Sequence, residues 1–126
     1  MSKQKINVWG REFELDIVYD CYTGEEVLAT QTDALANFLT KPELVNQSKS
    51  AVEKYCIERN ADEVGSSVID NIFKYVMPES LYVQRTKDGR HVVGLMCNYK
   101  YDIEHGIAVV FENEQLKYVD SQDSIL

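Results

Sequence analysis

Residues 91–119 read HVVGLMCNYKYDIEHGIAVVFENEQLKYV, and this stretch decides the fold. It contains strand-like apolar runs over 91–101, 106–112 and 115–119, separated by polar corners. Runs of β-branched and aromatic residues that are bounded by turn residues predict strands. Asn113-Glu114 joins the last two runs, so we expect them to form a hairpin.

Two more hairpins are predicted outward from this stretch. Leu81–Thr86 precedes Lys87-Asp88-Gly89-Arg90, and Asp-Gly between two strand-like runs is a strong hairpin signal. At the N-terminal end, residues 5–9 and 12–22 predict a first hairpin around Trp9-Gly10-Arg11. Apolar residues alternate with acidic ones from residue 12 onward, which predicts a strand with one apolar face and one acidic face.

The middle of the chain follows a helical period instead. Apolar residues spaced by three and four positions predict a short helix over residues 31–40. Thr40 and Pro42 suit the start of a second helix, which is expected to run to about Arg59. A third helix is predicted from Ser67 to Pro78, where the proline ends it.

Together these elements predict an α+β fold. We expect one domain over residues 1–126, built on an antiparallel sheet of about six strands. Three helices are expected between the second and third strands, packed on one face, which leaves the other sheet face open to solvent. The order of the strands across the helical insert stays open. The residues expected in the core are Phe13, Leu15, Ile17, Leu35, Phe38, Val52, Ile69, Phe73, Leu95, Val109 and Phe111.

The composition is that of an ordinary globular protein, with 44% apolar and 27% charged residues. No apolar run approaches the length of about 20 residues that a membrane-spanning helix needs. The beginning of the chain lacks the apolar stretch of a secretory signal, so we expect a cytoplasmic protein. Cys21, Cys56 and Cys97 are widely spaced, which predicts reduced cysteines that are buried or half-buried at the core and excludes a zinc ribbon.

The net charge of −8 is unevenly distributed along the chain. Residues 12–40 carry seven acids and no base, and residues 102–126 carry six acids and one base. Residues 1–11, in contrast, carry three bases and no acid. A surface formed by the two acidic segments repels nucleic acid and anionic lipid and attracts a basic partner. Solubility alone also explains an acidic surplus, so charge leaves both interpretations open.

The corner Asp102-Ile103-Glu104-His105-Gly106 carries residue types that can do chemistry. One histidine and two carboxylates resemble an acid–base pair or a fragment of a metal-binding triad. A metal would need a further ligand, and His91 is the only other histidine of the chain. The simpler interpretation is a turn with Gly106 in an unusual backbone conformation. No phosphate-binding or nucleophile motif is present, so we expect no cofactor and no metal.

Three patterns near the C-terminal end occur together. They are Gly-Leu-x-Cys at Gly94–Cys97, Glu-His-Gly-Ile-x-Val-x-Phe at Glu104–Phe111, and Val-x-x-Gln-Asp-x-x-Leu at Val119–Leu126. With Trp9-Gly10-Arg11-x-Phe13 at the other end, they resemble a family of small, largely uncharacterised bacterial domains. That family has a glycine where this chain has Asp120. The resemblance implies no catalytic residues. Similar small acidic domains serve as immunity proteins in bacterial toxin systems, including contact-dependent growth inhibition, which is an analogy and no more.

We therefore expect a protein-binding module without catalysis, specifically an acidic immunity protein that neutralises a basic toxin such as a nuclease. The candidate partner-binding residues are Glu12, Glu14, Asp16, Asp20, Asp102 and Glu104. The alternative is an enzyme or small-ligand-binding domain that uses Asp102, Glu104 and His105. A pocket at His105 would favour this alternative, whereas a solvent-facing acidic patch would favour the inhibitor.

Overall fold

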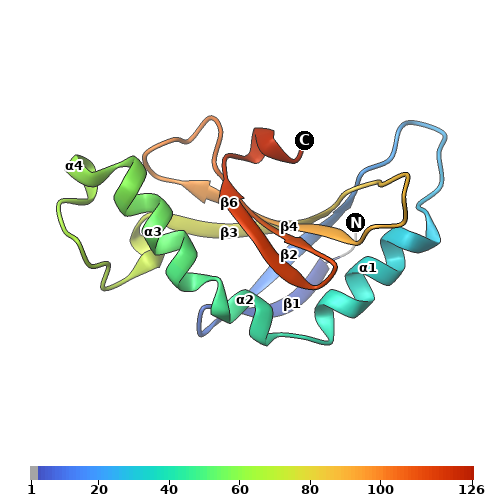
Figure 1. Ribbon diagram of the computed structural model, residues 1–126, viewed down its shortest axis with the longest axis horizontal. Helices are drawn as coiled ribbons and strands as arrows, with labels where there is room; N and C mark the ends of the chain where they lie inside the picture. The colour runs from blue at the N-terminus through green and yellow to red at the C-terminus, as the bar shows by residue number, and fades with distance from the viewer. Residues whose placement is uncertain (1–2) are drawn as a thin grey trace.

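The computed structural model describes residues 3–126 as one sheet with helices on one face (Figure 1). The strands are β1 Lys3–Val8, β2 Arg11–Tyr19, β3 Val76–Val83, β4 Val92–Tyr99, β5 Ile107–Glu112 and β6 Gln115–Asp120. The helices are α1 Ala29–Leu39, α2 Glu43–Gln47, α3 Lys49–Arg59 and the four-residue α4 Ala61–Val64. Two short 3-10 turns complete the fold, η1 at Ile72–Lys74 and η2 at Gln122–Ser124.

The six strands lie side by side in the order of the chain, β1-β2-β3-β4-β5-β6. Neighbouring strands are antiparallel except for β2 and β3, which are parallel, with Asp16 opposite Ser80 and Tyr19 opposite Val83. A parallel neighbour requires a crossover connection, and the helical insert between β2 and β3 provides it. The predicted α+β class and the position of the insert are confirmed. The predicted antiparallel pairing is corrected at this one pair.

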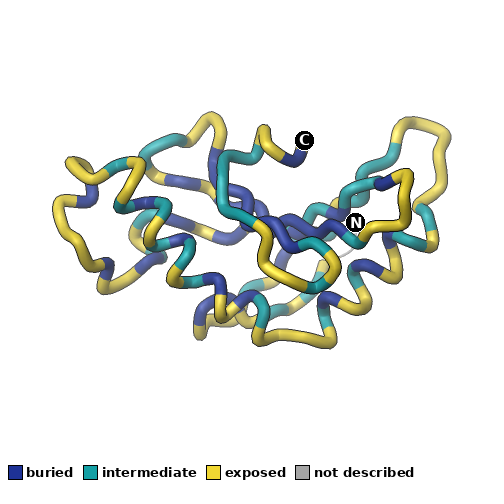
Figure 2. The backbone as a smooth tube through the Cα atoms, in the orientation of Figure 1, coloured by how far each residue is buried: buried dark blue, intermediate teal, exposed yellow. Residues whose placement is uncertain are grey.

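The main core lies between the sheet and the helices. Leu15, Leu95, Val109 and Phe111 from the sheet are at most 1% exposed. Phe38 of α1 packs on Phe111 with a ring-centroid distance of 5.0 Å. Figure 2 shows this arrangement as buried central strands and helices that are buried on their sheet side only. Val52 of α3 is also fully buried.

Four of the residues expected in the core are only half-buried, namely Phe13, Ile17, Leu35 and Phe73. All four pack against the core from its margin. Phe13 and Phe73 stack on each other at 5.4 Å, and the guanidinium group of Arg11 lies over both rings. The expectation of full burial was therefore wrong for these four, because each packs on the core with one side and leaves the other in contact with solvent.

The predicted third helix is also corrected. Residues 65–71 contain no regular helix, η1 covers only three residues, and β3 then begins at Val76. Ile69, Ile72 and Val76 are buried, as a helical stripe would have been, but an irregular chain brings them to the core. Pro78 lies inside β3 beside a bulge, where a missing N–H group is tolerated.

Two polar side chains fix the helices on the sheet. Ser48 interrupts the expected second helix between α2 and α3, and its buried hydroxyl accepts a hydrogen bond from Trp9 Nε1 at 3.1 Å. Gln31 of α1 is 1% exposed and donates through Nε2 to the carbonyl of Val83 at 3.2 Å. Thr40 caps the end of α1 rather than the start of α2, since its hydroxyl donates to the carbonyl of Asn37.

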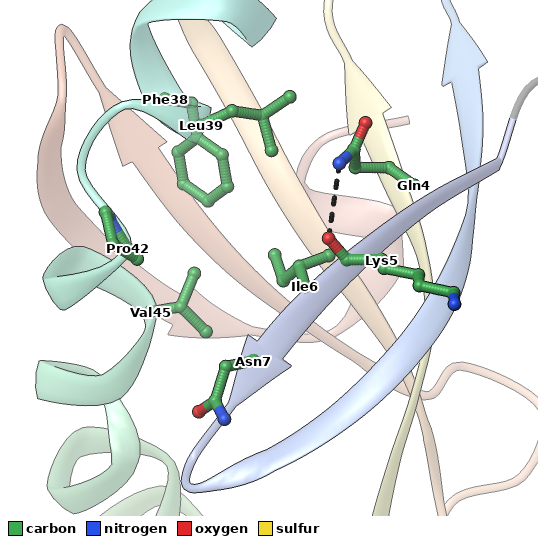
Figure 3. A pocket seen from close by; sticks show the side chains of 8 residues that line it. All are labelled: Gln4, Lys5, Ile6, Asn7, Phe38, Leu39, Pro42 and Val45. Atoms are coloured by element: carbon green, nitrogen blue, oxygen red, sulfur yellow. Dashed lines mark hydrogen bonds between the residues drawn. The ribbon is translucent and has the colours of Figure 1, made fainter.

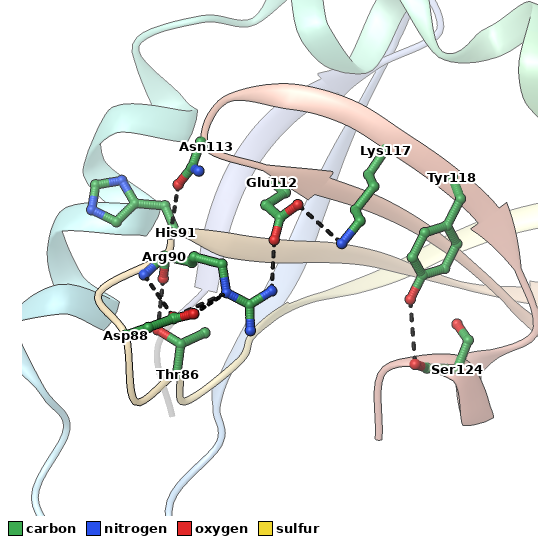
Figure 4. A network of polar contacts seen from close by, with 9 residues as sticks. All are labelled: Thr86, Asp88, Arg90, His91, Glu112, Asn113, Lys117, Tyr118 and Ser124. Atoms are coloured by element: carbon green, nitrogen blue, oxygen red, sulfur yellow. Dashed lines mark hydrogen bonds and ion pairs between the residues drawn. The ribbon is translucent and has the colours of Figure 1, made fainter.

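The predicted turn at Asp88-Gly89 is present and is tied to the next hairpin by charged side chains (Figure 4). The Arg90 guanidinium lies 2.8 Å from Asp88 Oδ2 and 2.7 Å from Glu112 Oε1. Glu112 also pairs with Lys117 at 3.0 Å. These pairs are at the surface, so we expect them to set geometry more than stability.

None of the helices described over residues 3–126 is long and apolar enough to span a membrane.

Candidate protein-binding face

The second face of the sheet, opposite the helices, is half-covered by the last residues of the chain. In Figure 1, α1 and α2 lie below the sheet and the C-terminal turn lies above it. Residues 121–126, which we call the C-terminal cover, place Ile125 against Val92, Met96, Ala108 and Val110. Ile125 is 3% exposed, so a small second core lies over β4 and β5.

The C-terminal cover is held by hydrogen bonds to the sheet. Gln84 Nε2 donates to the carbonyl of Ile125 at 3.1 Å, and Tyr118 donates through its hydroxyl to the carbonyl of Ser124 at 3.3 Å (Figure 4). Gln122 donates through Nε2 to the carbonyl of Cys97 and through its backbone N–H to the carbonyl of His105, both at 3.0 Å.

Two glycines make room for this cover. A Cβ atom at Gly94 would lie 3.0 Å from Ile125 Cδ1. Gly106 has φ +60°, and a Cβ atom there would lie 2.6 Å from both the Cys97 carbonyl oxygen and Gln122 Nε2. Gly94, Cys97, Gly106 and Gln122 all belong to the patterns that carried the family resemblance. Their shared task in this structure is to attach the C-terminal cover.

The other half of this face is uncovered and contains a groove of about 350 Å³. Three of its lining side chains are exposed apolar groups: Val18 of β2 is 41% exposed, Ile103 83% and Leu126 70%. We call this hollow the open groove, and its lining residues are Val18, Glu79, Ser80, Tyr82, Met96, Asn98, Ile103, Gln122 and Leu126. Exposed apolar groups gathered in one hollow are typical of a contact surface for another molecule.

The acidic face predicted for residues 12–20 is real but is partly neutralised. Glu12, Glu14 and Asp16 alternate along β2 on the face that carries Val18. In the β1–β2 register Lys5 stands opposite Glu14 and Lys3 opposite Asp16, with a Lys3 Nζ–Asp16 Oδ1 distance of 3.8 Å. Residues 12–40 contain no base, but the β1–β2 hairpin places two lysines of β1 beside these carboxylates.

Asp20 is engaged with a different part of the chain. Its Oδ2 atom accepts a hydrogen bond from the backbone N–H of Arg85 at 3.3 Å. The Arg85 side chain in turn pairs with Glu25 at 3.5 Å. Burial raises the pKa of Tyr82 to about 12, and the neighbouring Asp20 carboxylate adds to the effect. Asp20 is thus half-buried, and its carboxylate is hydrogen-bonded within the fold rather than free to contact a partner.

The corner at residues 102–106 adjoins the open groove through Ile103. His105 Nδ1 lies 3.0 Å from Asp102 Oδ1, and Nε2 lies 3.8 Å from Asp123 Oδ2. The hydrogen bond with Asp102 raises the pKa of His105 above its usual value, and the same bond lowers the pKa of Asp102. Glu104 beside them is exposed.

The corner at residues 102–106 is open to solvent. The side chains of His105, Asp102 and Asp123 are 44%, 42% and 70% exposed, so water reaches all three. The Cys97 thiol belongs to the main core, and burial raises its pKa, which makes it a poor nucleophile. Within residues 3–126 no three His, Cys, Asp or Glu side chains are grouped to hold a metal ion.

Sequence reasoning missed the open groove and the C-terminal cover. The groove combines β2, β3, β4, the corner and the last residues, and only the sheet order brings these together. One signal was present: Ile125 and Leu126 form an apolar pair after a polar stretch. In the structure Ile125 is the buried member of this pair and Leu126 the exposed one.

Comparison with known proteins gives a single finding. No curated protein sequence and no solved structure matches the chain significantly. The family model described as "Domain of unknown function (DUF6985)" matches residues 1–126. The match covers the whole chain, and the chain therefore belongs to the DUF6985 family.

Proposed function

We propose that this chain is a non-catalytic protein-binding module that contacts its partner through the open groove and the acidic side chains around it. The observation that carries the proposal is the groove itself, in which Val18, Ile103 and Leu126 leave apolar surface in water. Protein interfaces combine such an apolar centre with a polar rim. The side chain of His105, in contrast, is 44% exposed and does not line the open groove, so it gives less support to catalysis.

The rim indicates the charge of the partner. Glu79 lines the groove, Asp16 precedes Val18 by two positions on the same strand face, and Asp102 and Glu104 flank Ile103. Asp16 has Lys3 directly across the β1–β2 ladder, and Asp102 pairs with His105, whereas no ion pair described over residues 3–126 includes Glu79 or Glu104. Acidic groups around an apolar centre fit a partner with basic groups around an apolar protrusion, and they speed its association.

The finer form of the proposal is an immunity protein that neutralises a basic toxin, such as a nuclease whose cleft binds phosphates. The net charge of −8 supports it, as does the resemblance of the chain ends to small acidic bacterial domains. An acidic surface that covers a basic cleft also competes with the nucleic acid that the cleft would bind. Asp20 takes part only if the partner displaces Arg85.

The experiment uses proteins encoded beside this chain's gene as defined candidate partners. Each is purified and titrated against the chain by calorimetry. Ile103→Lys places a charge in the open groove and should weaken binding by about tenfold or more, as for a central interface residue. Val68→Lys is the matched control, because Val68 is likewise an exposed apolar loop residue, at 66% exposure, and does not line the groove.

Two results would contradict the proposal. One is that no neighbouring gene product binds the chain. The other is that Ile103→Lys and Val68→Lys weaken binding equally, since the groove would then have no special part in it. Loss of a toxin's activity on mixing would support a function as an immunity protein. Binding without that loss would support only the more general function as a protein-binding module.

A further inference from the structure

Strand β1 has a free edge. In the described part of the chain it pairs with β2 alone. Trp9 and Gly10 join the two strands with φ angles of +54° and +89°, which is the two-residue turn of a tight hairpin. The residues that flank such a turn, here Val8 and Arg11, exchange hydrogen bonds with each other.

The backbone groups on the free edge follow from that register. Hydrogen-bonded and non-bonded pairs alternate along an antiparallel ladder. Val8, Ile6 and Gln4 therefore bond to β2, while the N–H and C=O groups of Asn7, Lys5 and Lys3 point away from it. One contact agrees with this assignment: the Lys5 carbonyl accepts a hydrogen bond from the Gln4 side chain at 3.2 Å (Figure 3).

A pocket lies beside this edge, between β1 and the α1–α2 connection (Figure 3). Its volume is about 180 Å³, and its apolar walls are Ile6, Phe38, Leu39, Pro42 and Val45. An apolar cavity of about 150 Å³ accepts a benzene-sized group, so this pocket has room for one leucine or phenylalanine side chain.

We propose that β1 accepts an extended segment of a partner protein as an additional strand, with one apolar side chain of that segment in the pocket. The free N–H and C=O groups supply backbone hydrogen bonds, and alternate side chains of an added strand face opposite sides of the sheet. The residue opposite Ile6 faces the helices and the pocket. Its two neighbours face the side that carries Lys5.

The charge of β1 specifies this segment further. Lys3 is paired with Asp16, whereas none of the ion pairs in residues 3–126 includes Lys5. An acidic residue next to the apolar one would meet the Lys5 ammonium group on the side away from Glu14, which stands opposite Lys5 in β2. The preferred segment therefore alternates acidic and apolar residues.

The same lysines disfavour a second copy of this chain as the occupant. Of the antiparallel β1–β1 registers that pair outward residues, two set Lys5 opposite Lys3 or Lys5 of the copy, and like charges directly opposite are destabilising. The third sets Lys5 opposite Asn7 and places Lys3 beyond the end of the partner strand, opposite the turn residue Trp9. A shift by one residue sets the outward residues of β1 opposite residues of the copy that already bond to their own β2, so the hydrogen bonds between the two strands are lost. A different protein avoids both penalties.

The test uses a blocked synthetic peptide that alternates glutamate and leucine residues, with serine at each end. Amide hydrogen exchange of the full chain is followed by NMR with and without the peptide. Exchange should slow at the Lys5 and Asn7 amides, which are free in the hairpin. It should change little at Gln4 and Ile6, which already bond to β2. The variant Ile103→Lys should bind the peptide like the parent, because the open groove is a separate surface.

Two variants at one position separate backbone from charge. Lys5→Pro removes an outward N–H group that β2 does not use, so the melting temperature should stay unchanged while peptide binding weakens by about fivefold or more. Lys5→Gln keeps the N–H group and should weaken binding less. Three results would overturn the proposal: no slowing of exchange at Lys5 and Asn7, equal binding by Lys5→Pro and the parent, or a dimer of the parent that Lys5→Pro abolishes.

Discussion

Gly106 occupies a position that no other residue fits. Its φ of +60° disfavours side chains, and a Cβ atom would lie 2.6 Å from the backbone oxygen of Cys97. Gly106→Ala should therefore lower the free energy of unfolding by about 2–4 kcal/mol, as urea denaturation would measure. Gly89 is the control: its φ is +80°, yet nothing lies within 4 Å of a Cβ there. Gly89→Ala should cost only about 1 kcal/mol of backbone strain, and equal costs would refute the clash.

The His105–Asp102 contact predicts a pH dependence. The pKa of His105 is raised above 6.5, so its contribution to stability is complete below that pH and is lost as pH rises through the folded-state pKa. The pKa of Asp102 is lowered from 3.8, so its contribution is complete above that pH and is lost as pH falls further. The contact therefore stabilises the fold most between these two values. An NMR titration should place the His105 pKa above 6.5, and Asp102→Asn should lower it. An unchanged pKa in that variant would mean that the contact does not form in solution.

At the scale of elements, the C-terminal cover is the part that local sequence patterns describe least. Ile125→Ala should lower the free energy of unfolding by about 2–4 kcal/mol, because it empties the centre of the second core. Leu126→Ala is the neighbouring control and should change stability by at most about 0.5 kcal/mol, since Leu126 is 70% exposed. Chemical denaturation of both variants measures the difference. A silent Ile125→Ala would show that the cover is not docked.

The strands and the first helix were predictable because their periods are local. The alternation of apolar and acidic residues predicted β2, and the Asp88-Gly89 turn predicted the hairpin of β3 and β4. The spacing of apolar residues predicted α1. The prediction of the third helix was wrong because Val76 pairs with Tyr99 of β4, and this contact between residues far apart in the sequence is not visible in a local pattern. Its apolar residues are buried whether the chain is helical or irregular. Apolar spacing therefore predicted which residues of this segment are buried better than it predicted their backbone.

At the scale of the whole molecule, the candidate site was predicted only where it depends on a single strand, and not where it depends on contacts between distant strands. Sequence placed Glu12, Glu14 and Asp16 on one face of β2, and the structure has them there. It did not predict the lysines across the ladder, because facing residues depend on hairpin register. Nor did it predict the groove, because that requires β2 and β3 to be neighbours across the helical insert.

Charge should govern association if the partner is basic. Reversing Glu12 and Glu14 to Lys should slow association and flatten its salt dependence. Stopped-flow mixing over a range of salt concentrations measures this. Stability should fall by no more than about 1 kcal/mol, because both residues are exposed, although the new lysine at position 14 would stand opposite Lys5. Reversing Glu53 and Glu58 of α3, on the helical side, is the control and should matter less. If the control pair slows association more, recognition belongs to the helices instead.

The parallel pairing of β2 with β3 has a consequence for how the chain folds. Strands β3 to β6 form a meander of local contacts, whereas β2 meets β3 only after the whole helical insert has been closed into a loop. Closing a long loop is slow, so pulse-labelling should protect the amides of β4 and β5 before those that join β2 to β3. During synthesis the β1–β2 hairpin is made before β3, and both of its edges stay unpaired until β3 pairs with β2. Charged side chains on edge strands disfavour pairing with other chains, and the lysines of β1 and the carboxylates of β2 supply such charges to this hairpin.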